Sequence, residues 1–123
     1  PEPYVMLGFN VIADDTDEQA AYLATSPQQA FVSLRSGRPV RLPPPQADYL
    51  STIGPQEHAL LAQSLSCSAV GSPATVQAGL QSFIDRTGAD ELMIASQCFE
   101  HAARLRSHEI AAQVRGALRS SAR

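Results

Sequence analysis

The sequence lacks long apolar runs and any excess of basic charge. No apolar stretch approaches the roughly 18 residues that a membrane-spanning helix needs, and no basic-then-apolar signal segment opens the chain. The formal net charge of −3 disfavours a general nucleic-acid-binding or anionic-membrane-binding protein. We therefore expect a cytoplasmic protein with neither nucleic acid nor a membrane as its partner.

The sequence is also poor in residues that bind metals or form disulfides. Its two cysteines, Cys67 and Cys98, lie in apolar, strand-like surroundings without a Cys-x-x-Cys or Cys/His spacing. Buried free thiols of an intracellular protein are the simplest interpretation. His108 and Glu109 form no metal motif, because no second histidine follows at the required spacing. The sequence predicts no metal site.

What the sequence does contain is typical of a globular α/β domain. Its 123 residues, 44% of them apolar and 17% charged, suffice for one domain with a core. The first strand, at 4–13, is apolar almost throughout, as expected of a parallel strand covered on both faces. A short second strand is predicted around 67–70 and a third at 91–96.

Capping signals place the first helix, and a proline divides it. Thr16 and Gln19 have the spacing of a capping box, which starts a helix. Ser26 before Pro27 has the form of a fresh N-cap with proline at the first helical position. We therefore expect two short helices, or one helix kinked at Pro27, ending at Gly37.

The next stretch, 38–54, holds four of the nine prolines and has no periodicity. It is either a surface crossing or an insertion serving as an active-site lid. A helix follows at 55–65, with Ala59, Leu61, Ala62 and Leu65 expected to point inward.

Two further helices complete the predicted pattern. One lies between an N-cap at Ser72 and a glycine C-cap at Gly88, and a basic amphipathic helix starts at Glu100. Residues 116–123 are predicted to be a frayed tail.

Strands that alternate with helices predict a parallel sheet. Three parallel strands, one of them very short, make a poor isolated sheet. The pattern therefore indicates the end of a larger α/β domain.

Three stretches carry a resemblance to a known family. They are "PYVMLGFNVIADDTDEQA", "VGSPATVQAGLQSFIDRTGADELMI" and "HAARLRSHEI". In this order and spacing they resemble the C-terminal part of the luciferase-like flavin-dependent monooxygenases. The resemblance extends from Pro3 to about Ile110.

The resemblance implies a fold. The family has a (β/α)8 barrel with an insertion before its seventh strand, so 1–123 would be a single partial barrel segment whose insertion includes 38–54. Strands six, seven and eight of that barrel would lie at Tyr4–Ala13, Cys67–Val70 and Glu91–Ser96. A full barrel needs about 250 residues, so the first five strands would be missing.

The resemblance also implies an activity. Family members oxidise a small organic substrate with O2 and a reduced flavin, commonly FMN delivered by a separate flavin reductase, although some relatives use F420. Much of the flavin-phosphate site in such enzymes comes from earlier strands. We therefore expect this chain alone to be inactive and not to bind flavin.

Candidate site residues lie where the strands end, because barrels react at the carboxyl ends of their strands. His101 is the candidate catalytic acid–base group or ligand contact, or else only packs at a helix start. Asn10, the single asparagine, either satisfies nearby backbone or reaches a ligand. Ser96 and Gln97, at the third strand's exit, are candidate cofactor-binding residues.

The Gly71-Ser72 turn also raises two interpretations. Its backbone amides are candidates for holding a cofactor phosphate at the start of a helix. The turn has neither further glycines nor a lysine or arginine, and Pro73 removes one donor, so a plain helix cap is the alternative.

A function of another class also fits the sequence. A non-enzymatic α/β module could self-associate through an open, apolar sheet edge, because exposed edges pair with other strands. A homodimer is the expected product.

Overall fold

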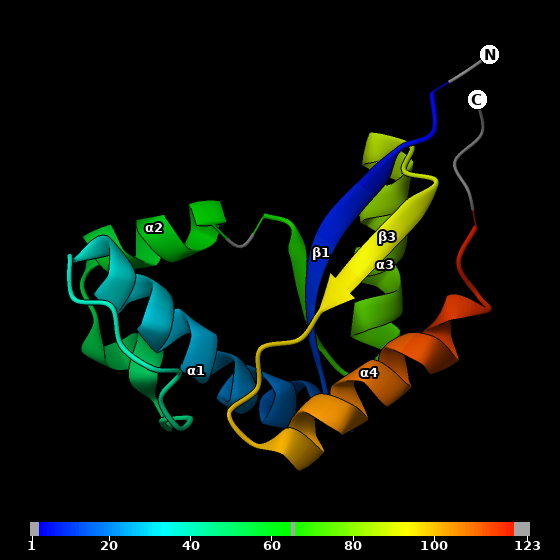
Figure 1. Cartoon of the computed structure of the whole chain (residues 1–123). Helices are drawn as coiled ribbons and strands as arrows, with labels where there is room; N and C mark the ends of the chain where they lie inside the picture. Colours follow the sequence, from blue (N-terminus) through cyan, green and yellow to red (C-terminus); the bar gives the residue numbers. More distant parts are fainter. Residues whose placement is uncertain (1–2, 65, 120–123) are drawn as a thin grey trace.

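The computed structural model describes residues 3–64 and 66–119 of the chain. Figure 1 shows the three strands side by side, with helices around them. In chain order the elements are β1 (Met6–Ala13), α1 (Asp17–Arg35), a 3-10 turn η1 (Tyr49–Thr52), α2 (Pro55–Ser64), β2 (Ser68–Gly71), α3 (Pro73–Thr87), β3 (Glu91–Ala95) and α4 (His101–Arg115). The predicted alternation of strands and helices is confirmed.

The sheet is parallel, and its strand order is β2-β1-β3. Gly8 of β1 is opposite Met93 of β3, whereas Asn10 to Ala13 of β1 are opposite Ser68 to Gly71 of β2. The placement of the three strands as consecutive barrel strands is therefore wrong, because strand seven would separate strands six and eight. In this chain β1 is the central strand: it pairs with β3 along one edge and, near its carboxyl end, with β2 along the other.

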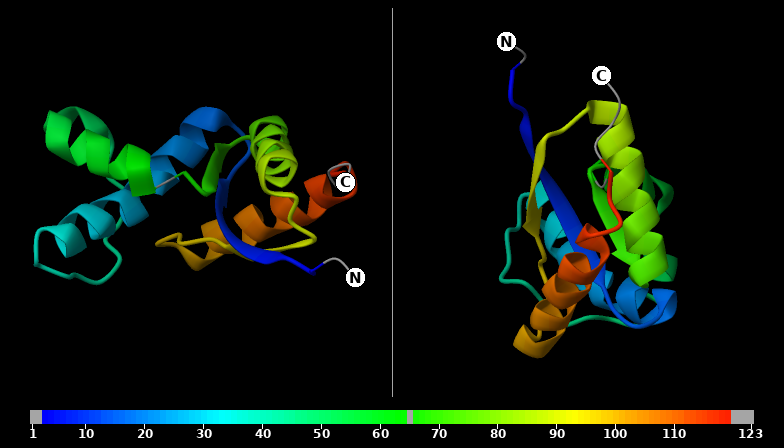
Figure 2. Two further views of the ribbon diagram at one scale, coloured as in Figure 1. Left: turned by 90° about the horizontal axis from the view of Figure 1, so that it is seen from above. Right: turned by 90° about the vertical axis from the view of Figure 1, so that its right-hand side faces the viewer.

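The main core lies on the face of the sheet that α3 and α4 cover (Figure 2). Phe9 of β1 meets Phe83 of α3 with ring centroids 4.7 Å apart. The buried members of this core are Phe9, Val11, Ala13, Ala69, Val76, Leu80, Phe83, Ile110 and Val114. The glycine at 79 lets α3 approach closely, because a Cβ there would lie 2.9 Å from the Cβ of Ala69.

The opposite face of the sheet carries a smaller core under α1. It joins Ile12 of β1 to Leu23 and Ala24 of α1 and to Cys98 after β3. The helices of a closed barrel surround its outer face, where α3 and α4 fit. The helix α1 therefore lies on the face that a barrel turns inward, at the carboxyl end of β1.

The helix α1 is continuous across its proline. It runs from Asp17 to Arg35 with Pro27 inside, so of the two expected alternatives the single helix is confirmed, whereas two separate helices with a cap at Ser26 are wrong. Ser26 is fully buried within the helix. Leu23 and Ala24 pack before the proline, and the Gln29 side chain after it donates to the Pro44 carbonyl, so tertiary contacts on both sides override the local stop signal. The Thr16 cap is confirmed, since its side chain accepts from the amide of Gln19.

The proline-rich stretch crosses the surface alongside α1. The carbonyl of Pro44 accepts from the side chain of Gln29 at 3.0 Å, and the amide of Gln46 donates to the Thr25 hydroxyl at 2.9 Å. The surface-crossing interpretation of 38–54 agrees with these contacts.

Few apolar side chains of α2 are buried. Leu61 is buried as expected, but Ala59 and Ala62 are exposed because α2 packs mainly against α1 (Figure 1). The expectation for Leu65 lies outside the described residues. So does most of the predicted frayed tail, of which only 116–119 are described.

Candidate functional site

Two of the predicted site residues meet at one cavity. Asn10 of β1 and Gln97 after β3 both line a space of about 270 Å³ beneath α1. We call this space the α1 cavity. Its lining residues are Asn10, Ile12, Ala24, Pro27, Gln28, Phe31, Ser68, Val70 and Gln97. It lies at the carboxyl end of β1, as a barrel site requires.

The described residues that line the α1 cavity combine apolar side chains with neutral polar ones, and none of these side chains is charged. Three of these polar groups are the amides of Asn10, Gln28 and Gln97. The Oε1 atom of Gln28 is buried and has no hydrogen-bond partner among the described residues. A cavity that is mostly apolar with a few convergent polar groups has the usual character of a small-molecule site.

Ser96, predicted to bind a cofactor, is instead part of a buried serine network. Its hydroxyl donates to the Ser107 hydroxyl at 2.7 Å, and Ser107 in turn donates to the carbonyl of Val11 at 3.2 Å. The amide of Ala13 donates to the same Ser107 oxygen at 3.0 Å. The network joins α4 to β1 just past the last residue of β1 that pairs with β3.

The Gly71-Ser72 turn holds an anion that belongs to the chain itself. The carboxylate of Asp17 accepts from the Ser72 amide at 2.7 Å and from the Thr75 hydroxyl at 2.8 Å. The bond from Ser72 is the largest cause that lowers the pKa of Asp17. A Cβ at Gly71 would lie only 2.6 Å from the same carboxylate oxygen. Asp17 thus takes the position that a phosphate would need.

His101 lies at the start of α4, away from the cavity lining. It is exposed, and its Nδ1 contacts the guanidinium of Arg104 one turn later. This arrangement agrees with a histidine that packs at a helix start.

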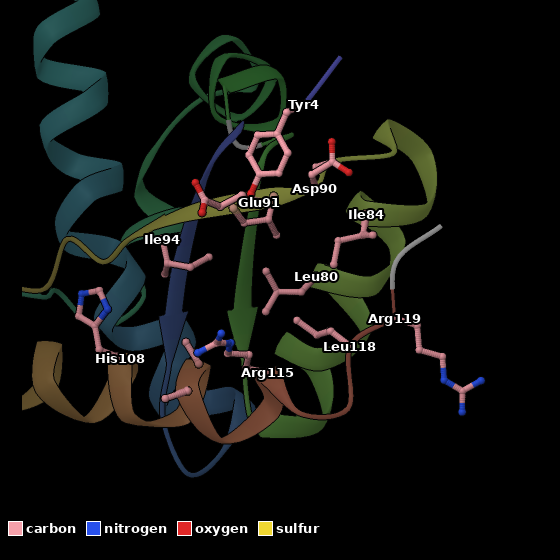
Figure 3. A pocket seen from close by; sticks show the side chains of 14 residues that line it. Tyr4, Leu80, Ile84, Asp90, Glu91, Ile94, His108, Arg115, Leu118 and Arg119 are labelled. Atoms are coloured by element: carbon pink, nitrogen blue, oxygen red, sulfur yellow. The ribbon is translucent and has the colours of Figure 1, made fainter. Parts of the chain in front are cut away.

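A second, larger hollow of about 680 Å³ lies between β3, α3 and α4 (Figure 3). Leu80 and Leu118 point into its middle, and Asp90, Glu91 and Arg115 stand around it. None of the predicted site residues lines this hollow.

The two cysteines differ in burial. Cys98 is buried, and its burial raises the pKa of the thiol. Cys67 is exposed, so its predicted burial is wrong: it precedes β2, outside both cores. Among the described residues no group of three or more His, Cys, Asp or Glu side chains could hold a metal ion. In the same part of the chain, every helix is too short or too polar to cross a membrane.

Three features of the fold and the cavity were not predicted from the sequence. Asp17 lies at the start of α1, yet its carboxylate accepts from the Ser72 amide at the start of α3. Ser107 falls on the buried stripe of α4 with Ile110 and Val114, and a polar residue in such a stripe was a usable signal. Gln28 follows a proline inside a helix, and nothing local indicated that it lines a cavity.

The strands and their covering helices define a class of structure: part of a (β/α)8-type barrel. The expected fold class is confirmed by a solved structure, the crystal structure of apo-MsnO8, which matches with a TM-score of 0.71 and 26% identity. The match covers 98% of this chain and 36% of that one. No protein-family model matches the chain.

Curated relatives then indicate the family. A luciferase-like monooxygenase of Escherichia coli (strain K12) is 46% identical over 114 residues, which cover 93% of this chain. The protein YvbT of Bacillus subtilis (strain 168) is 47% identical over 113 residues, or 92% of this chain. The chain spans 34% of the length of each relative. The resemblance is confirmed: this chain is homologous to about a third of a luciferase-like monooxygenase.

Proposed function

We propose that this chain is the part of a luciferase-like monooxygenase that forms one wall of its reaction site. The whole protein would oxidise a small organic substrate with O2 and a reduced flavin. One observation carries the proposal: Asn10 of β1 and Gln97, two residues after the neighbouring strand β3, converge on the α1 cavity at the carboxyl end of β1. The homology to a luciferase-like monooxygenase supplies the reaction class.

The residues present fit one part of a flavin and not another. A neutral ring with hydrogen-bonding edges suits the amides of Asn10 and Gln97 and the apolar cavity wall. The flavin phosphate does not suit the Gly71-Ser72 turn, because the carboxylate of Asp17 already accepts the Ser72 amide and would repel a second anion.

The flavin would supply the redox chemistry, and the protein would supply orientation and exclusion of water. In this chain, Asn10 and Gln97 would orient a ring by hydrogen bonds. The side chains of Ile12, Phe31 and Val70 would keep water out of the cavity.

A fluorescence titration tests the proposal. FMN, or F420 as the alternative, should bind the full-length protein that contains this chain, and Gln97→Ala should weaken that binding. This chain alone should show no stoichiometric binding at micromolar FMN, since it lacks a free phosphate site at α3. Failure of the full-length protein to bind either flavin would refute the proposed function, and micromolar binding by this chain alone would refute its inertness.

A second candidate function rests on a different observation. On the face of the sheet opposite α3 and α4, Met6 and Met93 are 51% and 61% exposed. A sheet face this apolar favours association with another copy. We propose a homodimer as the alternative assembly of this chain, and a sedimentation experiment that finds a monomer at high concentration would contradict it.

A further inference from the structure

We propose that Ser107 of α4 is a positioning residue, which fixes the backbone beside Asn10 and Gln97 although it does not line the α1 cavity itself. This deepens the proposed function, on which it rests, because Asn10 and Gln97 are the amides proposed to orient a ring. Three features of the structure carry the inference: the end of a strand, a chain of hydroxyl groups and the exposure of the two amides.

The first feature is the end of β3. Its pairing with β1 stops where Ala95 is opposite Asn10. Gln97 follows two residues later, outside the sheet, yet it lines the α1 cavity together with Asn10. The position of Gln97 therefore depends on whatever holds the segment after β3 against β1.

The second feature is the group that holds this segment. The Ser96 hydroxyl donates to the Ser107 hydroxyl at 2.7 Å, and Ser107 donates to the carbonyl of Val11 at 3.2 Å. Ser96 directly precedes Gln97, and Val11 directly follows Asn10. A single hydroxyl on α4 thus connects the neighbours of both cavity amides.

The hydrogen bonds of Ser107 leave its hydroxyl one orientation. The hydroxyl has one proton, which goes to Val11, and its oxygen accepts from Ser96 and, at 3.0 Å, from the amide of Ala13. Ser107 is fully buried and Ser96 nearly so. Hydrogen bonds away from water are electrostatically stronger and polarise one another, so this network is a rigid link.

The third feature is the exposure of the two amides. The side chains of Asn10 and Gln97 are both exposed, so a ligand can reach them and little packing restrains them. Their placement then depends mainly on their backbone. Because a binding group must be held within about 0.5 Å of its productive position, a small shift of either backbone weakens the site.

A second contact between α4 and the end of β1 is weaker. The guanidinium of Arg106 binds the carboxylate of Asp15 at 2.7 Å, but both side chains are in contact with water. Exposed ion pairs contribute little to stability and are screened by salt. The buried Ser107 hydroxyl is therefore the contact that fixes α4 against this part of β1.

Flavin titration of the full-length protein that contains this chain tests the proposal, with FMN as the probe, or F420 if FMN does not bind. Ser107→Ala should weaken binding about tenfold, because the cavity amides are misplaced. Ser96→Ala, which leaves the bonds of Ser107 to β1 intact, should weaken it less. The control Val114→Ala removes buried volume from the same helix without touching the network, and should stay within about twofold of the unchanged protein.

A double-mutant cycle asks whether Ser107 acts through Gln97. In a Gln97→Ala background, Ser107→Ala should change the flavin affinity by less than about twofold, because the group that it positions is already gone. A purely structural serine would weaken binding equally in both backgrounds. Equal effects in the two backgrounds, or a loss in Val114→Ala as large as in Ser107→Ala, would overturn the proposal.

Hydrogen exchange of the full-length protein gives a reading that needs no flavin. Mass spectrometry should find faster exchange in 96–100 in both Ser107→Ala and Ser96→Ala, and unchanged exchange there in Val114→Ala. If Ser107→Ala does not fold, Ser96→Ala alone gives this reading. Unchanged exchange in 96–100 in the serine variants would overturn the positioning role. If the unchanged protein binds neither flavin, the proposed function fails, and the exchange rates still decide whether Ser107 holds Gln97.

Discussion

At the scale of single residues, Ser107 hydrogen-bonds two backbone groups of β1 that lie beyond its pairing with β3. The pairing of β1 with β3 ends at Asn10, so the Val11 carbonyl and the Ala13 amide have no strand partner on that side. The Ser107 hydroxyl donates to the first and accepts from the second. One side chain from α4 thus replaces the continuation of β3.

Ser107→Ala should lower the free energy of unfolding by about 1–3 kcal/mol, because two buried backbone groups lose their side-chain partner and the Ser96 hydroxyl keeps only the Cys98 thiol. Ser82→Ala, on the exposed side of α3, is the matched control and should change it by less than about 0.5 kcal/mol. Urea denaturation of both variants measures the difference, and equal midpoints would show that the network does not stabilise the fold.

Asp17 makes stability depend on pH. Its folded-state pKa is lowered from 3.8, first by the Ser72 amide and then by the Thr75 hydroxyl. A depressed carboxyl pKa stabilises the folded state above the unfolded pKa, and this contribution is lost as the pH falls through the folded value.

The melting temperature of Asp17→Asn should therefore lie below that of the unchanged chain at neutral pH. The gap should shrink as the pH falls below about 4, because Asp17 becomes neutral too. Thermal unfolding followed by circular dichroism between neutral pH and about pH 2 measures this gap. A gap that stays constant over that range would contradict the capping role.

At the scale of elements, the local sequence signals in α1 indicated a helix boundary that the structure does not have. The Ser26-Pro27 pair has the form of a helix start, and locally that interpretation is sound. In the fold, Leu23 and Ala24 are buried before the proline, and the stretch 38–54 packs along α1 on both sides of it, through Thr25 and Gln29. The tertiary contacts of α1 stabilise the helix by more than the missing backbone hydrogen bond at Pro27 destabilises it.

Pro27→Ala should raise the free energy of unfolding by about 1–2 kcal/mol, because a helix interior regains a hydrogen bond while the unfolded chain gains some entropy. The control Pro73→Ala lies at the first position of α3, where proline fits, and should cost less than about 1 kcal/mol. Denaturant titration measures the sign of the change in the free energy of unfolding. A destabilised Pro27→Ala variant would mean that proline at this position stabilises α1.

At the scale of the whole molecule, the strand order decides which residues share a site. Because β1 lies between β2 and β3, Asn10 has neighbours from both edges, and Ser68 and Gln97 reach the same cavity. With β2 in the middle, Asn10 and Gln97 would have stood one strand further apart.

Cysteine pairs test this order. Gly8→Cys with Met93→Cys places two thiols on adjacent, paired positions and should form a disulfide on mild oxidation. Val70 is level with Ile12 and Met93 is level with Gly8. The pair Val70→Cys with Met93→Cys is therefore separated by two strand spacings and by about four residues along the strands, about 16 Å, and should stay reduced. Peptide mapping by mass spectrometry identifies the bridges among the native cysteines. Bridging of the second pair alone would restore the consecutive order.

The sequence by itself determined the element order, the Thr16 and Gly88 caps, the apolar β1 and the resemblance to luciferase-like monooxygenases. These features are local: each follows from residues within a turn or a strand of one another. The sequence also singled out Asn10 and Gln97, which line one cavity, because a polar residue inside an apolar strand or just after a strand can be recognised from its neighbours in the sequence.

Only the tertiary structure decided that β3 pairs with β1, that Asp17 caps α3 and that Ser107 completes the edge of β1. The bonds concerned join residues 55 positions apart for Asp17 and Ser72, and 96 apart for Ser107 and Val11. Such partners are chosen by which surfaces can be buried together, a property of the folded chain as a whole. The local spacing of residues does not encode these long-range partners. Asp17 at a helix start and Ser107 on a buried helix face therefore acquire their roles only in the folded chain.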